Sequence, residues 1–358
     1  MLLFNSANKS RGAGFDPKNR FEKLYIDYND ENLDIFDDIE IKENTPTEFY
    51  FDNTKTLIVH NDSPDVGFDF SINPYRGCEH GCIYCYARPS HEYLGFSPGI
   101  DFETKIIVKH DAPELLEAEL SKKSWIPQPI ALSGNTDCYQ PVERKLQLTR
   151  RCLEVFLKLR NPVSITTKNA MILRDLDILK ELASMQLASV TISISSLNRE
   201  LTRKMEPRTS VPSQRLHTIE ELSKNGIQVG VLVAPIIPGL TDEEIPNILK
   251  EASEHGATFA GKVMLRLPHQ NEALFIEWLN RIYPEKASKI LNRIKDVRQG
   301  NLNDPNFNSR MTGTGEIANS INNLFYASEK KYNLHNHKEV LATDKFIRKD
   351  DVNQTEMF

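Results

Sequence analysis

The stretch that decides the fold is Asn73-Pro-Tyr-Arg-Gly-Cys-Glu-His-Gly-Cys-Ile-Tyr-Cys-Tyr-Ala87. It places Cys78, Cys82 and Cys85 on one short loop in the spacing C-x3-C-x2-C. Iron–sulfur clusters are held by cysteine thiolates, usually four of them. Three thiolates on a loop of this length can each hold one iron of a cubane cluster and leave the fourth iron without a protein ligand. An open coordination position of this kind is typical of a catalytic metal site.

Two other interpretations of these cysteines are weaker. A structural zinc site needs four ligands, usually in two separated pairs, and Cys138 and Cys152 lie far away and are not paired in that way. A disulfide framework is not expected from five cysteines in 358 residues. His80 could ligate a metal, although a loop histidine is more often polar surface. Gly77 and Gly81 let the loop wrap tightly, because glycine enters positive φ at little cost.

The chain around this loop alternates between strand and helix patterns. Helical patterns are predicted over about 111–122, 143–159, 173–185, 213–224, 241–255, 271–282 and 284–298, and a further helix reaches about 331. Between them lie six strand patterns: Phe68–Ile72, Pro129–Ser133, Val163–Thr166, Val190–Ile194, Gln228–Ala234 and Thr258–Leu265.

This alternation predicts an α/β fold with a parallel sheet and right-handed crossovers. Closed barrels of this type have eight units. Six units therefore favour a partial (β/α)6 TIM-like barrel with N- and C-terminal extensions. Functional sites in such folds collect at the carboxyl ends of the strands, and the cysteine loop follows the first of them.

Composition divides the chain into three predicted parts: an acidic extension over 1–65, a core over 66–270, and a helical extension with a polar tail over 271–358. Residues 16–53 hold twelve Asp and Glu against four Lys and Arg, while the whole chain has a net charge of −6. Such a balance does not support general nucleic-acid binding. No stretch is long and apolar enough to span a membrane, and no signal peptide is evident, so we expect a cytoplasmic protein without a membrane partner.

The motifs resemble those of a known family. The cysteine spacing with an aromatic residue, Tyr84, before the last cysteine resembles the signature of the radical S-adenosylmethionine (SAM) superfamily. Over about residues 66–270 the order of motifs is similar to that of its spore photoproduct lyase-like, DNA-repair photolyase-related branch. The stretches that carry this resemblance are Ser71–Pro89, Ala131–Glu143, Ser164–Lys168, Ser193–Ser195 and Met205–Arg208.

The resemblance implies cofactors and a partial barrel. It implies a [4Fe–4S] cluster on Cys78, Cys82 and Cys85, with SAM bound to the open iron through its amino and carboxylate groups. It also implies reduced flavodoxin or ferredoxin as electron donor. Cleavage of SAM would then give methionine and a 5′-deoxyadenosyl radical that abstracts hydrogen from the substrate. The cofactors carry such chemistry, and the protein orients them and excludes water.

The same resemblance suggests residues that bind SAM. Lys168 is a candidate partner for the SAM carboxylate, with a snorkelling surface lysine as the alternative. Ser133, Ser193 and Ser195 match positions that hydrogen-bond SAM, although serine at a strand end often only satisfies backbone groups. Arg208 either pairs with Glu206 or meets another carboxylate as a bidentate donor.

Two tyrosines and one alanine lie at positions that the family uses for radical relay and hydrogen donation. Tyr84 and Tyr86 match family positions linked to radical relay, and packing under the loop is the alternative for Tyr86. Spore photoproduct lyase carries a cysteine hydrogen donor two residues before a SAM-contacting serine. If Ser133 matches that serine, the donor position is occupied by Ala131. Cys138 is close in sequence but does not fall at the donor position. Lesion repair by that mechanism is therefore not supported.

The sequence leaves two functions open. One is a radical SAM enzyme that acts on an unidentified substrate, with nucleic acid as one candidate class. The other is a non-catalytic iron–sulfur protein that transfers electrons or acts as a sensor. Polar residues at several strand ends favour the enzyme, because an electron carrier needs none of them.

Overall fold

The computed structural model describes residues 11–21, 46–335 and 340–348. Its main sheet has the strand order β10-β9-β8-β7-β6-β3-β2. The strands from β3 to β10 in this order run parallel, and β2 pairs antiparallel with β3 at one edge. Their bounds are β2 Val59–His60, β3 Phe70–Ile72, β6 Ile130–Leu132, β7 Val163–Thr167, β8 Ala188–Ser193, β9 Gln228–Ile236 and β10 Phe259–Met264.

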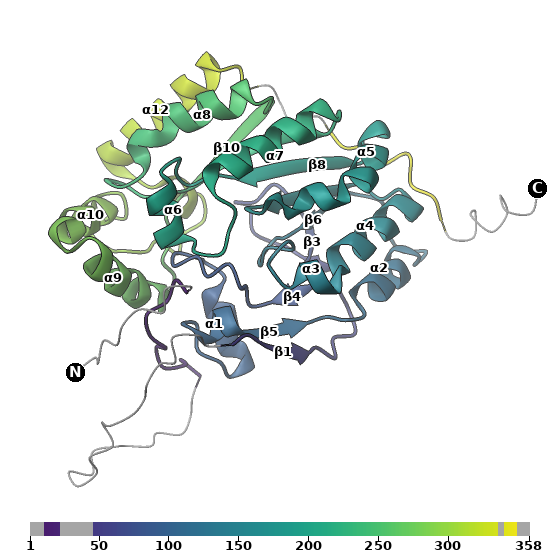
Figure 1. The fold of residues 1–358 in the computed structure, drawn as a ribbon, viewed down its shortest axis with the longest axis horizontal. Coiled ribbons are helices and arrows are strands. Elements are labelled where there is room, and N and C mark those ends of the chain that lie inside the picture. The colour runs from purple at the N-terminus through teal and green to yellow at the C-terminus, as the bar shows by residue number, and fades with distance from the viewer. Residues whose placement is uncertain (1–10, 22–45, 336–339, 349–358) are drawn as a thin grey trace, which may run out of the picture.

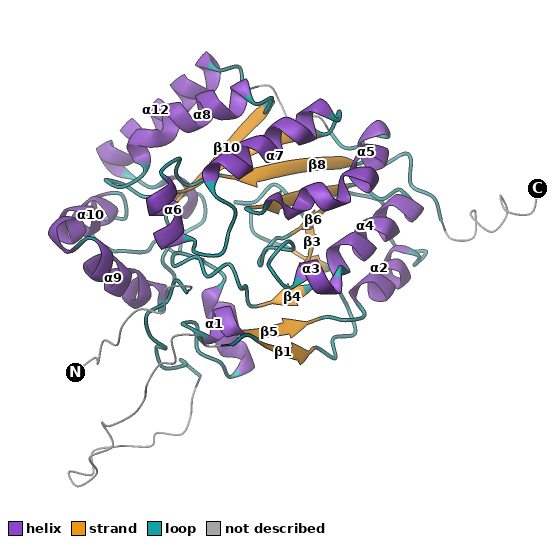
Figure 2. Cartoon of the chain, in the orientation of Figure 1, coloured by secondary structure: helices purple, strands orange, loops and turns teal. Residues whose placement is uncertain are grey.

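The parallel strands are those that the sequence predicts, and most are buried along their length. In β7 the residues alternate between buried and half-buried, while β6 is buried throughout, as expected for a parallel sheet covered by helices. Helices surround the sheet in Figures 1 and 2. The helices in the first part of the chain, up to β10, are α1 Asp101–Thr104, α2 Ala112–Leu120, α3 Glu143–Leu146, α4 Leu148–Leu159, α5 Leu176–Ser184, α6 Arg199–Met205, α7 Pro212–Lys224 and α8 Ile245–Glu254.

The predicted helix over 143–159 is interrupted. Gln147 has a φ of 53° and separates α3 from α4. The buried carboxylate of Glu143 accepts a hydrogen bond from the Thr149 N–H at 3.1 Å. The chain therefore begins a second helix at Leu148 instead of continuing the first one, and Glu143 stays buried against Tyr75 and Arg174.

A small second sheet was not predicted. It has the order β1-β5-β4 and contains β1 Glu48–Phe51, β4 Tyr75–Arg76 and β5 Lys105–Val108. β1 pairs parallel with β5, although more than fifty residues separate them in sequence. No local pattern reveals a pairing over that separation, because both strands are short and β1 is exposed throughout.

The two edges of the main sheet meet through loops. Arg310 forms an ion pair with Asp65, which lies between β2 and β3. Its guanidinium also donates to Ser63 Oγ at 2.6 Å. The segment after β10 thus reaches the loop before β3, so the sheet is curved. The helices after β10 are α9 Asn271–Ile282, α10 Pro284–Asp296, α11 Ser309–Thr312 and α12 Gly315–Lys331.

The main core lies between the sheet and helices α2, α4, α5, α7, α8 and α12. A second buried cluster joins the cysteine loop to α9 and α10 and includes Ile83, Phe275 and Trp278. The cysteine loop is therefore packed from both sides. Within the described part of the chain, no helix combines the length and apolarity needed to cross a membrane.

Candidate functional site

The candidate site residues follow the carboxyl ends of neighbouring strands. The cysteine loop follows β3, Ser133 follows β6, Lys168 follows β7, and Ser193 ends β8. Parallel strands bring their carboxyl ends to one edge of the sheet. The fold therefore gathers side chains that lie up to 115 residues apart in sequence, from Cys78 to Ser193.

The cysteine loop is a series of tight turns. Gly77 and Gly81 have φ values of 76° and 65°, which confirms the need for glycine at these positions. The Gly81 N–H donates to Cys78 O at 3.3 Å, and the Cys85 N–H donates to Cys82 O at 3.2 Å. The chain therefore wraps twice within the loop and points three cysteines into a common region.

The three loop sulfurs do not form the compact group that a single tetrahedral ion would require. The Sγ atoms of Cys78, Cys82 and Cys85 do not all lie within 4.8 Å of one another, whereas the ligands of one tetrahedral zinc ion lie about 2.3 Å from the metal and hence close together. Sulfurs that each hold a different iron are more widely spaced. Thiolate donors also suit iron–sulfur clusters.

The remaining two cysteines lie elsewhere. Cys138 and Cys152 are fully buried and belong to the main core, apart from the clusters that contain the loop cysteines. The Cys138 N–H donates to Ser133 Oγ at 2.8 Å, so Cys138 helps to shape the loop after β6. Neither residue is placed to supply a fourth ligand.

Hydrogen bonds occupy both ring nitrogens of His80. Two hydrogen bonds orient the Asn169 amide. Its oxygen accepts from Met171 N–H at 3.0 Å, and its nitrogen donates to Tyr139 O at 2.8 Å. The Asn169 amide nitrogen lies 3.1 Å from His80 Nε2, and His80 Nδ1 faces Asp137 Oδ2 at 3.4 Å. Burial lowers the pKa of His80, but Asp137 and Cys78 outweigh burial and raise it to about 9. His80 positions the loop and has no nitrogen free for a metal.

A buried support lies behind the loop. Arg88 donates to the carbonyl of Cys82 at 3.0 Å and forms an ion pair with Glu103. The Glu103 carboxylate also accepts the N–H groups of Gly12 and Ala13, at 3.0 and 2.9 Å. A Cβ at Gly12 would lie only 1.8 Å from Gly81 O. Part of the predicted N-terminal extension is therefore built into the support of the cysteine loop.

Glu206 is the centre of a buried polar network. Its carboxylate accepts hydrogen bonds from Tyr84 Oη and, at 2.7 Å, from Ser195 Oγ, and it forms an ion pair with Arg215. Burial opposes its ionisation, but the charges of Arg215 and Lys168 outweigh that effect and hold the pKa of Glu206 below its usual value. The network joins the cysteine loop to β8 and α7.

Lys168 lies beside the cysteine loop. Burial lowers its pKa, but the neighbouring Cys82 and Glu206 outweigh burial and raise it. The ammonium forms no ion pair within 4.0 Å among the described residues. Its backbone N–H donates to Asp137 Oδ2 at 2.9 Å. A charged lysine is therefore held next to Cys82 without a dedicated carboxylate partner among the described residues.

The three serines differ in their contacts. Ser133 is half-buried, its oxygen accepts a hydrogen bond from Cys138 N at 2.8 Å, and its hydroxyl contacts the Cys138 side chain. Ser193 and Ser195 are buried, and their hydroxyls donate to Ala234 O at 3.2 Å and to Glu206. Ser133 is thus the member of this set best placed to meet a ligand.

Arg208 does not pair with Glu206. It forms an ion pair with Glu79 at 3.2 Å, and Glu79 lies directly after Cys78. The buried Glu79 carboxylate also accepts the Val142 N–H at 2.7 Å. Of the two alternatives, the pairing with Glu206 does not form, because Arg215 projects from α7 to Glu206; Arg208 meets another carboxylate, that of Glu79. Arg208 instead supports the loop that carries the cysteines.

The two tyrosines of the loop have different surroundings. Tyr84 is buried against Glu206. Tyr86 is 47% exposed, its hydroxyl donates to Gly134 O at 2.7 Å, and the guanidinium of Arg266 lies 5.6 Å from its ring centroid. Tyr84 anchors the loop from below, whereas Tyr86 lies on its accessible side.

Arg215, Glu103 and Arg266 were missed by sequence reasoning. Arg215 lies within the predicted helix, where an arginine is ordinarily exposed. Glu103 lies in a segment that showed no helical period, and Arg266 follows the last strand without a motif. Arg266 could have been identified as a site candidate, because it directly follows a predicted strand. The partners of Arg215 and Glu103 are distant in sequence, so no local pattern identifies them.

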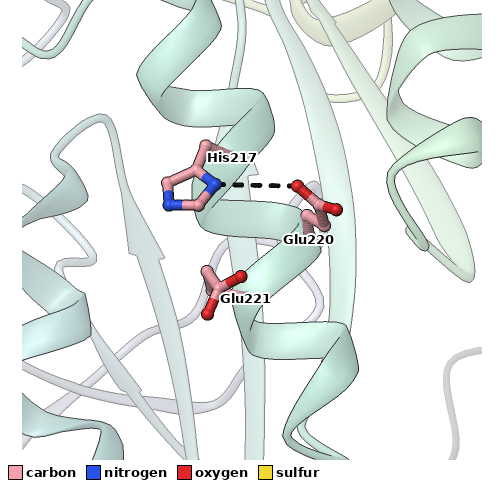
Figure 3. A group of neighbouring side chains, drawn as sticks. All are labelled: His217, Glu220 and Glu221. Atoms are coloured by element: carbon pink, nitrogen blue, oxygen red, sulfur yellow. Dashed lines mark ion pairs between the residues drawn. The ribbon is translucent and has the colours of Figure 1, made fainter.

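A compact group of ligand-type side chains lies apart from this site. Among the described residues, only His217, Glu220 and Glu221 bring three such atoms within 4.8 Å of one another. They lie on one exposed turn of α7, as Figure 3 shows, and His217 faces Glu220 at 3.6 Å. Lys224 pairs with both glutamates. We interpret the group as a solvated helix face.

Comparison with known proteins identifies relatives of uncharacterized function. An uncharacterized protein of Mycobacterium tuberculosis is 38% identical over 224 residues, which cover 62% of this chain and 66% of the relative. The chain thus spans just under two thirds of that relative. An uncharacterized protein of Methanocaldococcus jannaschii is 31% identical over 227 residues, which cover 63% of this chain and 81% of the relative.

A solved structure has the same fold. Spore photoproduct lyase complexed with dinucleoside spore photoproduct matches with a TM-score of 0.57 and 15% sequence identity, over 79% of this chain and 78% of that chain. At this identity the match establishes the fold alone. It confirms the predicted mixed α/β architecture with a parallel sheet.

The family itself follows from the sequence of the core. The family model described as "Radical SAM superfamily" matches residues 72–252, just over half of the chain. The match contains the cysteine loop and the strand ends that carry Ser133, Lys168 and Ser193. The chain belongs to the radical SAM superfamily, whose cofactors are a [4Fe–4S] cluster and SAM.

Proposed function

We propose that the protein is a radical SAM enzyme that holds a [4Fe–4S] cluster on Cys78, Cys82 and Cys85 and cleaves SAM reductively. When bound, the two cofactors supply a one-electron cleavage of the SAM sulfonium to methionine and a 5′-deoxyadenosyl radical. One observation carries the proposal: the Lys168 ammonium lies beside Cys82 without a carboxylate partner within 4.0 Å among the described residues. An electron carrier has no use for such a lysine.

The protein's own residues have separate tasks in this proposal. Lys168 binds the SAM carboxylate, and Ser133 donates a hydrogen bond to SAM. Ser193 and Ser195 position the end of β8, the latter through Glu206. Arg208 supports the cysteine loop through Glu79. Tyr86, on the accessible side of the loop, faces the substrate, and burial of the loop beneath it excludes water.

Three finer features belong to the same proposal. The core is a partial (β/α)6 barrel, supported by the parallel strands from β3 to β10. Residues 1–65 and 271–358 are extensions of that core. A reduced flavodoxin or ferredoxin supplies the electron. The catalytic reaction acts on a substrate outside the cofactor pair.

The test of the function is a product assay. Anaerobically reconstituted protein, reduced with dithionite and given SAM, is expected to release methionine and 5′-deoxyadenosine in equal amounts, read by chromatography. Protein without reductant is the control. Iron and sulfide present without any 5′-deoxyadenosine, across nucleic-acid and metabolite pools, would identify a carrier or sensor instead.

Replacement of Lys168 tests the SAM site directly. Lys168→Ala should weaken SAM binding about tenfold or more, because a hydrogen bond to a charged group contributes about 1.5–3 kcal/mol. Cluster content should be unchanged, since the lysine is not a ligand. Calorimetric titration of reconstituted protein measures the affinity, and Lys158→Ala, on the outer face of α4, is the matched control. Equal affinities of the two variants would place Lys168 outside the site.

A further inference from the structure

A short, exposed segment links the two end strands of the main sheet. β10 and β2 end the strand order, and residues 304–312 lie between them, with α11 in contact with β10. Both the Asn308 N–H and the Arg310 guanidinium donate to the carboxylate of Asp65, which follows β2. Arg310 also donates to Ser63 Oγ at 2.6 Å. The segment therefore joins the two edges of the sheet through side chains and not through a strand.

The segment reaches the cysteine loop through one arginine. Met311 Sδ accepts a hydrogen bond from Arg266 Nη1 at 3.7 Å. The Arg266 guanidinium lies 5.6 Å from the ring centroid of Tyr86, the residue that follows Cys85. The charges of Lys168 and Arg266 both act on the Tyr86 hydroxyl. The segment therefore stands at the accessible side of the site, where Tyr86 is 47% exposed.

Little buried apolar surface holds the segment in place. None of the four residues of α11 is buried, and Phe307 is 53% exposed. From the interior, the buried Arg298 guanidinium donates to Ser309 O and Arg310 O, at 2.9 Å each. The Asp304 carboxylate lies near the same guanidinium. A segment with few buried apolar contacts opens at a low free-energy cost, and its fixed side is the one at Arg298.

The turn that meets Asp65 is strained. Asn308 has a φ of 65° and a ψ of −62°, and the Ser309 N–H donates to Phe307 O at 2.9 Å. A hydrogen bond across one residue in this conformation defines the rare, strained form of the γ-turn. Such a turn persists only where its surroundings hold it, and here the Asn308 N–H is held by Asp65. Strain in the turn therefore favours release once that contact breaks.

We propose that residues 304–312 form a latch segment, fastened by Asp65 and anchored at Arg298, that opens to let SAM enter and leave the site. The inference rests on the proposed function, because SAM is the ligand that passes. Asp65 and Arg310 lie outside the cysteine loop and the strand ends assigned to SAM. The latch segment should therefore set how fast SAM passes and not how tightly it binds, since a ligand with equal affinity for two states does not shift their equilibrium.

The first experiment measures opening of the latch segment by hydrogen exchange of anaerobically reconstituted protein, read by mass spectrometry. Asp65→Asn removes the charge that both donors of the segment share, so amide hydrogens in the peptide over residues 304–312 should exchange about tenfold faster or more. Asp177→Asn, which removes a carboxylate from an exposed ion pair on α5, is the matched control and should leave that exchange unchanged. Equal exchange rates in Asp65→Asn and the wild type would overturn the role of Asp65.

The second experiment measures the passage of SAM. Reconstituted protein without reductant is loaded with tritiated SAM and diluted into unlabelled SAM, and rapid filtration follows the loss of label. Asp65→Asn and Arg310→Gln should each release and take up SAM about tenfold faster or more with an unchanged Kd, because opening precedes both steps. The double variant should be no faster than the faster single variant, since both substitutions break the same ion pair.

Two further results would overturn the proposal. One is wild-type rates of SAM exchange in variants whose latch segment exchanges hydrogen faster. The other is a weakened Kd with an unchanged rate of uptake, which would make the segment part of the binding surface. The assay for 5′-deoxyadenosine is run on the same wild-type preparation. Bound SAM that is not cleaved would refute the proposed function and leave the result on the latch segment standing, so the two claims fail separately.

Discussion

Replacing Cys82 by alanine is expected to abolish both the iron–sulfur cluster and SAM cleavage. The three loop cysteines are the only thiolates near the site among the described residues, so the loss of one leaves two ligands for a cluster that is normally held by more. Iron and sulfide analysis, with the visible absorption of anaerobic protein, gives the readout. Cys78→Ala and Cys85→Ala should behave in the same way.

The matched controls are the two cysteines of the main core. Cys138→Ala and Cys152→Ala should retain the colour and iron content of the wild type, because both side chains pack among apolar residues away from the loop. They will lose some stability, since removing a buried atom leaves a small cavity. Loss of the cluster from either variant, with retention in a loop variant, would show that the ligand assignment is wrong.

Replacing Glu206 by alanine is expected to lower the free energy of unfolding by about 3–5 kcal/mol, the usual cost of removing one partner of a buried ion pair. The change leaves the Arg215 guanidinium buried and without its carboxylate, and it removes the acceptor of Tyr84 and Ser195. Denaturant unfolding of protein without a cluster measures the change, so that cluster loss does not contribute.

A double variant separates the lost charge pair from the lost volume. Glu206→Ala combined with Arg215→Met should be more stable than Glu206→Ala alone, because the second change removes the unpaired buried charge. Additive destabilisation of the two substitutions would show that the ion pair is not what Glu206 contributes. Tyr84→Phe, which removes one hydroxyl from the same carboxylate, should cost only about 1 kcal/mol.

The sequence alone was sufficient for the family and for the parallel strands of the main sheet, and it predicts the cluster ligands. The spacing of Cys78, Cys82 and Cys85 is chemically specific within one loop, so it does not depend on distant residues. The strand and helix patterns also act locally, since each reflects which faces of one segment are buried. The need for glycine at Gly77 and Gly81 could also be predicted from local sequence, because the turn itself sets the backbone conformation there.

The tertiary structure decided the partners of the charged residues. Glu206 meets Arg215 and not Arg208, and Arg208 meets Glu79, because the crossing of β8, α6 and α7 sets which side chains face one another. Arg266 reaches the ring of Tyr86, and Arg310 reaches Asp65, through the curvature that brings β10 toward the loop before β3. Segments that approach only when the sheet curves leave no periodic trace in the sequence, so long-range contacts of this kind follow from the packed fold and not from local pattern.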